Sequence, residues 1–297
     1  MESTQPHPRD YPVPRRLLGK TGRSLSVIGF GGILVMNAEP RHAADVVAEA
    51  VDRGVNYFDV APSYGNAEEI LGPALSPHRD KVFLACKTGR RDRKGAWEQL
   101  EESLKRLHTS YFDLYQLHGL IDLEKDVGAA FGPDGAMEAL VKAREKGLAR
   151  HLGFSAHTPE AAVRAMELFD FDTILYPINV VCHHHRQFEV RPLEEARRRK
   201  MGILALKAMA RTSWDSGRTL VKRSAYAKCW YEPFTRADDA REALRFTLSQ
   251  PGVTAALPPG EEALFWLALD LLPEVFTVSD VDQQFVKMTM SELTPIF

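Results

Sequence analysis

The feature that most constrains the fold is a repeated alternation of short β-rich runs with amphipathic helical segments. Such an alternation is typical of βα units, which place their strands side by side in a parallel sheet. Eight runs of this kind occur, near residues 25–30, 55–59, 81–86, 112–117, 148–154, 173–177, 202–206 and 253–257. Eight units suit a closed barrel better than an open doubly wound sheet. The sequence therefore predicts an α/β fold, a (β/α)8 TIM barrel.

The segments between these runs carry helix signals. Gly54 follows a segment with an apolar face and suits the left-handed position after a helix; that face comprises Ala43, Val46, Val47, Ala50 and Val51. Thr158 and Pro159 have the order of a helix N-cap followed by a first-turn proline. The rhythm breaks between Arg211 and Arg236, where no strand is evident. We expect a long βα loop there, and such loops often build a site.

Composition argues for a small-molecule partner. The 297 residues include 38 basic and 40 acidic ones, a formal net charge of −2, which gives no electrostatic footprint for nucleic acid or an anionic membrane. No run approaches the ~20 apolar residues of a membrane span, and the polar, proline-rich residues 1–14 predict a flexible segment. Three cysteines without CxxC spacing fit a reducing compartment. We expect a cytoplasmic protein without nucleic-acid or membrane partners.

Four titratable residues follow the predicted strands. Asp59 ends the second run, Tyr64 lies in the loop after it, Lys87 follows the third run and His118 follows the fourth. Because active sites of this fold lie at the carboxyl ends of the strands, we expect these four side chains on one rim.

The chemistry of these residues is coherent with reduction of a carbonyl group, which requires an acid at the oxygen as hydride reaches the carbon. Free tyrosine, with a pKa of ~10, is a poor acid. We expect the ammonium of Lys87 to lower the pKa of Tyr64 towards neutrality and Asp59 to keep Lys87 charged. His118 can donate a hydrogen bond that orients the carbonyl.

Two blocks resemble the aldo-keto reductase family. RRLLGKTGRSLSVIGFGG is similar to the opening β-hairpin and first strand of that family, and GVNYFDVAPSYGNAEEILGPAL to its most characteristic block. The resemblance covers nearly the whole chain and implies a single barrel domain over residues 15–297. It also implies a catalytic tetrad of Asp59, Tyr64, Lys87 and His118, with NADPH or NADH bound without a Rossmann domain.

The cofactor contacts that the resemblance implies carry over less completely. HLGFSAH matches the family at Ser155, but Ala156 replaces an expected asparagine. Asn179 is a candidate for the contact to the nicotinamide carboxamide. Leu206 stands where an aromatic residue usually stacks on the nicotinamide ring, and Lys207 follows it.

Charged residues leave the choice of cofactor open. Glu261 and Glu262 stand where members that use NADPH usually carry basic residues, and they would repel a 2′-phosphate. Arg211, Lys222 and Arg223 are candidates for binding the pyrophosphate, although a basic loop residue is more often only solvated.

Two further clusters have alternative interpretations. We expect His183, His184 and His185 on a substrate-facing loop rather than on a metal, because three consecutive side chains rarely face one ion. Trp214, Trp230 and Tyr231 can either line a substrate pocket or pin the long loop.

The leading functional hypothesis is an oxidoreductase that transfers hydride between a nicotinamide cofactor and an aldehyde, ketone or alcohol. One alternative keeps the barrel but uses Lys87 as the Schiff base of a lyase, which requires a neutral lysine. Another is a non-catalytic sensor that binds the cofactor, because a fold does not define a function.

Overall fold

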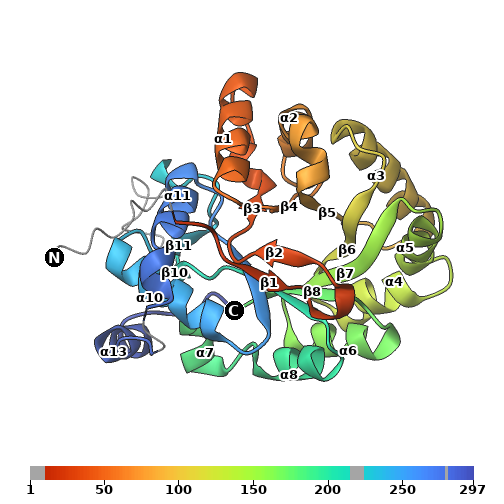
Figure 1. The fold of residues 1–297 in the computed structure, drawn as a ribbon. Helices are drawn as coiled ribbons and strands as arrows, with labels where there is room; N and C mark the ends of the chain where they lie inside the picture. Colours follow the sequence, from red (N-terminus) through yellow and green to blue (C-terminus); the bar gives the residue numbers. More distant parts are fainter. Residues whose placement is uncertain (1–10, 215–223, 278–279) are drawn as a thin grey trace.

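Eight parallel strands form a nearly closed barrel with helices around it (Figure 1). The computed structural model describes residues 11–214, 224–277 and 280–297. Hydrogen bonds link the strands in the order β12-β9-β8-β7-β6-β5-β4-β3, and Ile28 meets Ala256 in a parallel bridge across the remaining seam. The predicted (β/α)8 TIM barrel is confirmed.

The barrel strands follow the predicted runs. They are β3 (Phe30–Gly31), β4 (Tyr57–Asp59), β5 (Phe83–Thr88), β6 (Phe112–Leu120), β7 (Ala149–Ala156), β8 (Thr173–Pro177), β9 (Gly202–Leu206) and β12 (Val253–Leu257). The longer helices are α1 (Pro40–Asp52), α2 (Ala67–Leu75), α3 (Arg93–Arg106), α5 (Ala136–Glu145), α6 (Pro159–Leu168), α8 (Val190–Arg198), α10 (Ala237–Ser249), α11 (Glu262–Asp270) and α13 (Gln283–Ser291). Short helices are η2 (Gly19–Thr21), η3 (Gly32–Val35), η4 (Ser76–Lys81), η5 (Leu123–Gly128), α4 (Ala129–Phe131), α7 (Val180–Arg186) and α12 (Leu272–Val275).

Local sequence explains where the helices begin and end. The side chain of Glu39 accepts a hydrogen bond from the backbone of His42, and Pro40 occupies the first turn of α1. Helix α1 is followed by Gly54, with φ +97°, a conformation that suits glycine. The hydroxyl of Thr158 caps α6 by accepting from the backbone of Ala161. The end of α1 at Gly54 and the start of α6 at Thr158 were both predicted.

The amino-terminal β-hairpin that the resemblance implied is confirmed, but the predicted bounds of the first strand are wrong, because residues 25–30 divide between two sheets. β2 (Ser24–Ser26) pairs with β1 (Arg15–Leu17) in an antiparallel hairpin, and the barrel strand begins only at Phe30. The side chain of Asn56 accepts a hydrogen bond from the backbone of Ser26 and donates one to the carbonyl of Ser24, which ties the hairpin to the barrel. One apolar run therefore supplies both sheets.

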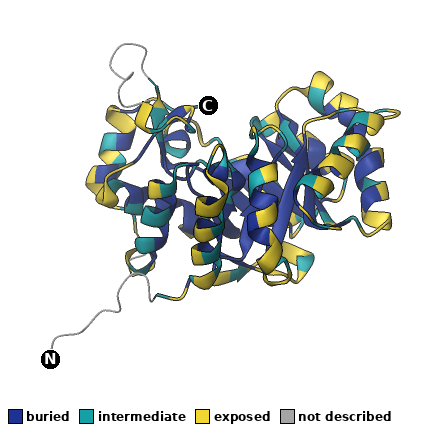
Figure 2. Cartoon of the chain, turned by 90° about the horizontal axis from the view of Figure 1, so that it is seen from above, coloured by how far each residue is buried: buried dark blue, intermediate teal, exposed yellow. Residues whose placement is uncertain are grey.

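The hairpin closes the amino-terminal end of the barrel, and Figure 1 shows it lying across the barrel axis. Leu18 and Leu25 from this segment join a cluster of buried side chains inside the barrel; the others are Tyr57, Phe83, Ala85, Leu114, Leu175, Leu204, Ala255 and Leu257. A larger cluster fills the layer between strands and helices. Figure 2 shows the buried centre and the exposed outer faces of the helices. The amino-terminal end of the barrel is thus filled by side chains, and the carboxyl-terminal end is left open for a site.

The amino-terminal segment is only partly described. Residues 1–10 of the predicted flexible segment 1–14 lie outside the described residues. Val13 is buried, and the carbonyl of Pro14 accepts a hydrogen bond from Val27. The last residues before the hairpin thus contact the barrel.

The long loop between β9 and α10 contains two strands that the sequence did not reveal. β10 (Ala210–Ser213) and β11 (Tyr231–Pro233) pair antiparallel, with a shift in register at Ala210 and Thr212. Because these strands are short and their pairing is irregular, the sequence shows no alternation of apolar and polar residues there. We call residues 210–233 the β10–β11 arm; Lys222 and Arg223, two predicted pyrophosphate contacts, lie outside its described residues.

The helices of the described chain give no sign of membrane insertion. In the described ranges, no helix combines the length and the apolar character that crossing a bilayer requires.

Replacement of Leu18 tests the role of the hairpin in closing the barrel. Leu18 is 0% exposed inside the barrel, so Leu18→Ala should lower the free energy of unfolding by about 2–5 kcal/mol, measured by urea denaturation. The neighbouring Leu17 is 66% exposed, and Leu17→Ala should change stability by less than about 0.5 kcal/mol. Equal effects of the two substitutions would contradict this account.

Candidate active site

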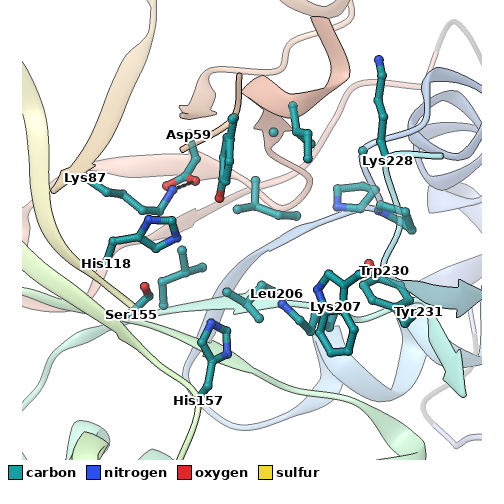
Figure 3. A pocket seen from close by; sticks show the side chains of 18 residues that line it. Asp59, Lys87, His118, Ser155, His157, Leu206, Lys207, Lys228, Trp230 and Tyr231 are labelled. Atoms are coloured by element: carbon teal, nitrogen blue, oxygen red, sulfur yellow. Dashed lines mark hydrogen bonds and ion pairs between the residues drawn. The ribbon is translucent and has the colours of Figure 1, made fainter. Parts of the chain in front are cut away.

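A cavity of about 250 Å³ opens at the carboxyl end of the barrel strands (Figure 3). Asp59, Tyr64, Lys87 and His118 all line it, as the sequence predicted from their positions after strands. The other lining residues are Gly31, Ile33, Ser155, His157, Leu175, Leu206, Lys207, Lys228, Trp230, Tyr231, Leu257, Pro258, Pro259 and Gly260. We call this cavity the pocket.

Asp59 and Lys87 form a buried ion pair at one side of the pocket. The ammonium of Lys87 donates to Oδ1 of Asp59 and to the carbonyl of Val60, at 3.3 Å. Oδ2 of Asp59 accepts from Nε2 of Gln116 at 3.1 Å and from the hydroxyl of Tyr57 at 3.3 Å. The carboxylate is therefore hydrogen-bonded on both oxygens, as a buried charge requires.

Tyr57 and Gln116 are site residues that our sequence analysis missed. Each lies two residues before a predicted site residue on the same strand: Tyr57 before Asp59, and Gln116 before His118. Because side chains two apart on a strand point to the same face, this spacing was a usable signal. The register of β5 with β6 also pairs Lys87 with Gln116.

Tyr64 lies against this ion pair. The ammonium of Lys87 is 5.3 Å from the centre of the Tyr64 ring, and the His118 ring meets that ring edge-on at 5.9 Å. Burial raises the pKa of Tyr64, and the charge of Lys87 lowers it by less, so the net pKa is above its ordinary value. The expected fall of the Tyr64 pKa towards neutrality is therefore wrong for this structure. At neutral pH the side chain is a protonated phenol.

Lys87 keeps its charge despite complete burial. Burial lowers the pKa of Lys87, but Asp59 and then Tyr64 raise it by more, so that the net pKa lies above its ordinary value. This agrees with the expectation that a carboxylate holds the proton on this lysine.

His118 is neutral. Burial, followed by the positive charge of Lys87, lowers the pKa of His118 to about 3. Its Nδ1 lies 3.5 Å from the hydroxyl of Ser63. A neutral imidazole can donate one hydrogen bond and accept another, so the ring can act towards a ligand in the pocket without carrying charge.

Three of the seven predicted cofactor contacts line the pocket: Ser155, Leu206 and Lys207. The hydroxyl of Ser155 accepts from the backbone of Gly119 at 2.8 Å. Ala156, which stands where the family has an asparagine, is buried among core side chains.

Asn179 and Arg211 do not line the pocket. The side-chain oxygen of Asn179 caps α7 by accepting from the backbone of the first turn, and its side-chain amide donates to the backbone carbonyls of Lys207 and Ala210. Leu175 is instead the residue of β8 that faces the pocket. Arg211 forms an ion pair with Glu232, 3.1 Å away on the neighbouring strand of the β10–β11 arm. Both side chains thus hold the loop above the barrel.

Glu261 and Glu262 lie beside a second cavity of about 540 Å³ that shares Lys228 with the pocket. Glu261 accepts from the backbone of Lys228 at 2.7 Å. Glu262 contacts the ring of His42 at 2.7 Å and accepts from the indole of Trp266 at 3.1 Å. Both carboxylates are held in place by neighbouring groups.

The three consecutive histidines lie on helix α7, and the expectation of a substrate-facing loop is wrong. His183 contacts Glu189 through Nδ1 at 2.5 Å, and Nε2 of His185 lies 3.0 Å from the carbonyl of Thr289. None of the three lines the pocket. His183 and His185 connect α7 to neighbouring segments.

Both alternatives for the aromatic residues of the long loop occur. Trp230 and Tyr231 line the pocket. Trp214 instead donates from its indole to the carbonyl of Cys229 at 2.8 Å and pins the β10–β11 arm.

Comparison with known proteins identifies the family. The model of the aldo/keto reductase family matches residues 27–225, and the chain therefore belongs to that family. It is 27% identical over 271 residues to the oxidoreductase YqkF of Bacillus subtilis, covering 82% of this chain and 85% of YqkF. The aldo-keto reductase YhdN of the same organism is 28% identical over 216 residues, 65% of this chain and 61% of YhdN.

Solved structures agree with this assignment. A structure titled as an aldo-keto reductase from Pseudomonas aeruginosa matches with a TM-score of 0.69 and 26% identity, over 90% of this chain and 100% of the other. The holo form of a Bacillus halodurans aldo-keto reductase gives a TM-score of 0.70 at 18% identity, over 94% and 96% of the two chains, which supports the fold. Membership in the family implies nicotinamide-dependent oxidoreduction of carbonyl compounds.

The ionisation of the histidines can be tested directly. The pKa of His118 and of His157 is lowered to about 3, for both mainly by burial, whereas hydrogen bonding to Glu189 raises that of His183. In NMR titrations, the rings of His118 and His157 should stay neutral between about pH 8 and pH 5, whereas His183 should titrate above the ordinary value of about 6.5. Titration of His118 near 6.5 would contradict its burial beside Lys87.

Proposed function

We propose that this protein reduces aldehydes or ketones to alcohols with a nicotinamide cofactor, and that Tyr64 donates the proton. The observation that carries the proposal is the buried Lys87–Asp59 ion pair, which lies against Tyr64 and beside His118 in one pocket. A protonated phenol, a fixed cation and a neutral imidazole are what protonation of a carbonyl oxygen requires.

The pocket suits the nicotinamide end of the cofactor. Leu175, Leu206 and Leu257 supply an apolar surface on which a planar ring can pack. The hydroxyl of Ser155 accepts from Gly119 and keeps its own proton to donate to the carboxamide. When bound there, the cofactor supplies the hydride. The apolar contact of Leu206 takes the place of the aromatic stacking usual in the family.

Four residues of the chain have separate roles in the proposed protonation of the carbonyl oxygen. Tyr64 donates its proton to that oxygen, and the charge of Lys87 stabilises the phenolate that the transfer leaves. His118 donates a hydrogen bond that orients the carbonyl. Asp59 keeps Lys87 charged and is itself held by Tyr57 and Gln116. The ion pair thus acts on the carbonyl through Tyr64, against which it lies.

The two alternative functions have less support. A Schiff base on Lys87 requires a neutral amine, whereas Asp59 holds this lysine charged. A cofactor sensor is compatible with the unusual residues Ala156 and Leu206. It does not explain why a buried ion pair lies against Tyr64.

The test of this function is oxidation of NADPH and of NADH by the purified protein over a panel of aldehydes and ketones. Tyr64→Phe should lower kcat by a factor of about 10²–10⁴, because it removes the general acid. Cofactor affinity, measured by fluorescence titration, should be retained. Tyr111→Phe is the matched control, since Tyr111 does not line the pocket. Tight cofactor binding without turnover in the wild type would instead establish the sensor.

The raised pKa of Tyr64 also predicts a pH profile. Below that pKa the side chain is the phenol that reduction needs, so kcat/KM for reduction of an aldehyde without a carboxylate should stay flat from about pH 7 to pH 9. Oxidation of the corresponding alcohol needs the phenolate and should accelerate as pH rises over the same range. A reduction rate that falls with a midpoint near neutrality would show that the pKa of Tyr64 is lowered instead.

A further inference from the structure

Lys207 is the feature of the pocket that the proposed mechanism leaves unused. It follows β9 directly, and its half-buried side chain lines the pocket. Figure 3 shows it beside Trp230, across the pocket from Asp59, Lys87 and His118. Its ammonium lies 5.2 Å from the ring centre of Trp230 and 5.8 Å from that of Phe297.

The three lysines of the pocket differ in their partners. Lys87 is paired with Asp59, and the ammonium of Lys228 donates to the carbonyl of Leu34 at 2.6 Å. The ammonium of Lys207 lies over two aromatic rings, and among the described residues it forms no ion pair with a carboxylate. A buried or half-buried charge without a counterion favours an anionic ligand.

The charges around Lys207 leave its positive charge uncompensated. Asp59 and Lys87 neutralise each other, and the pKa values of His118 and His157 are lowered to about 3, so both rings are neutral. Burial, followed by the charge of Lys87, lowers the pKa of Lys207 to about 8, which still leaves most of it charged at neutral pH. This side of the pocket is therefore positive.

The backbone of Lys207 is held in an unfavourable conformation. Its φ is +64°, in the left-handed region that a lysine rarely adopts. Its carbonyl accepts from the amide of Asn179 and from the backbone of Ala210, which fixes this turn. The direction of the side chain is thus set by the fold rather than left to solvent.

We infer that the pocket takes carbonyl substrates that carry a carboxylate, with the acid group bound by Lys207 and the carbonyl placed at Tyr64 and His118. This inference rests on the proposed function and names its substrate class, aldehyde or keto acids. Trp230, which lines the pocket beside Lys207, would flank the apolar part of such a substrate.

A single ammonium between aromatic rings suits one acid group on an apolar skeleton. A diphosphate, by contrast, is usually bound by several donors, including backbone N–H groups at a helix N-terminus. The charge of Lys207 also contributes to lowering the pKa of His118, so its field reaches the residue that orients the carbonyl. These observations favour the substrate over the diphosphate of the cofactor as the source of the anion.

The test compares 4-formylbenzoate with its neutral methyl ester at saturating cofactor, in the wild type and in Lys207→Met and Lys207→Arg. The wild type should prefer the acid over the ester in kcat/KM by about tenfold or more. Lys207→Met should abolish this preference, and Lys207→Arg should restore most of it. Lys94→Met is the control, because Lys94 is 85% exposed on α3 and should keep the wild-type preference.

Two results would overturn the inference while leaving the proposed reductase standing. One is equal reduction of acid and ester by the wild type. The other is an equal loss for both substrates in Lys207→Met with a raised KM for the cofactor, which would assign Lys207 to the diphosphate.

A binding measurement tests the inference even if neither aldehyde is reduced. Absence of reduction would count against the proposed function itself. Titration calorimetry of 4-(hydroxymethyl)benzoate into the protein with cofactor should show binding at least about tenfold tighter for the wild type than for Lys207→Met. Equal affinities would overturn the inference.

Discussion

The interaction on which the site depends is the buried ion pair of Lys87 and Asp59. Both side chains are almost fully buried, and removing either partner would leave a charge inside the barrel at a cost of about 3–5 kcal/mol. The pair is tolerable because the barrel supplies further partners: Gln116 and Tyr57 for the carboxylate and the carbonyl of Val60 for the ammonium. The geometry of adjacent parallel strands places all of these groups in contact, so the chemistry of the site is inseparable from the register of β4, β5 and β6.

The acidity of Tyr64 differs from the expectation that the charge of Lys87 alone sets its pKa. The ammonium of Lys87 lowers the pKa of the phenol, but burial raises it by more, because a phenolate loses its water on entering the barrel. The net result keeps the proton on Tyr64 at neutral pH, so that the proton is present for transfer to a carbonyl oxygen. In the proposed mechanism, the charge of Lys87 stabilises the phenolate that forms as the proton leaves Tyr64.

The fold and the centre of the site could be predicted because both depend on patterns within single strands. Eight apolar runs predicted the barrel. The positions of Asp59, Lys87 and His118 at the ends of three of these runs predicted that their side chains meet at the carboxyl end of the barrel. Features that depend on contacts between distant segments could not be predicted from such patterns. The point at which the run at 25–30 divides between the expected hairpin and the barrel is one of them, because it is fixed by the hydrogen bonds of Asn56 to Ser24 and Ser26. Likewise, Asn179 carries the polarity of a ligand contact, yet its amide is bonded to Lys207 and Ala210, and Leu175 faces the pocket instead.

The central claim is that Asp59 and Lys87 act as one unit on Tyr64, and a double-mutant cycle measures this directly. Asp59→Asn, Lys87→Met and the double variant would be compared in kcat/KM for one aldehyde, with the free energy of unfolding determined for each. If the pair acts as a unit, the double variant should lose about as much activity as either single variant, since the second change removes nothing further. Independent losses that multiply in the double variant would contradict this account and show that the two residues contribute separately.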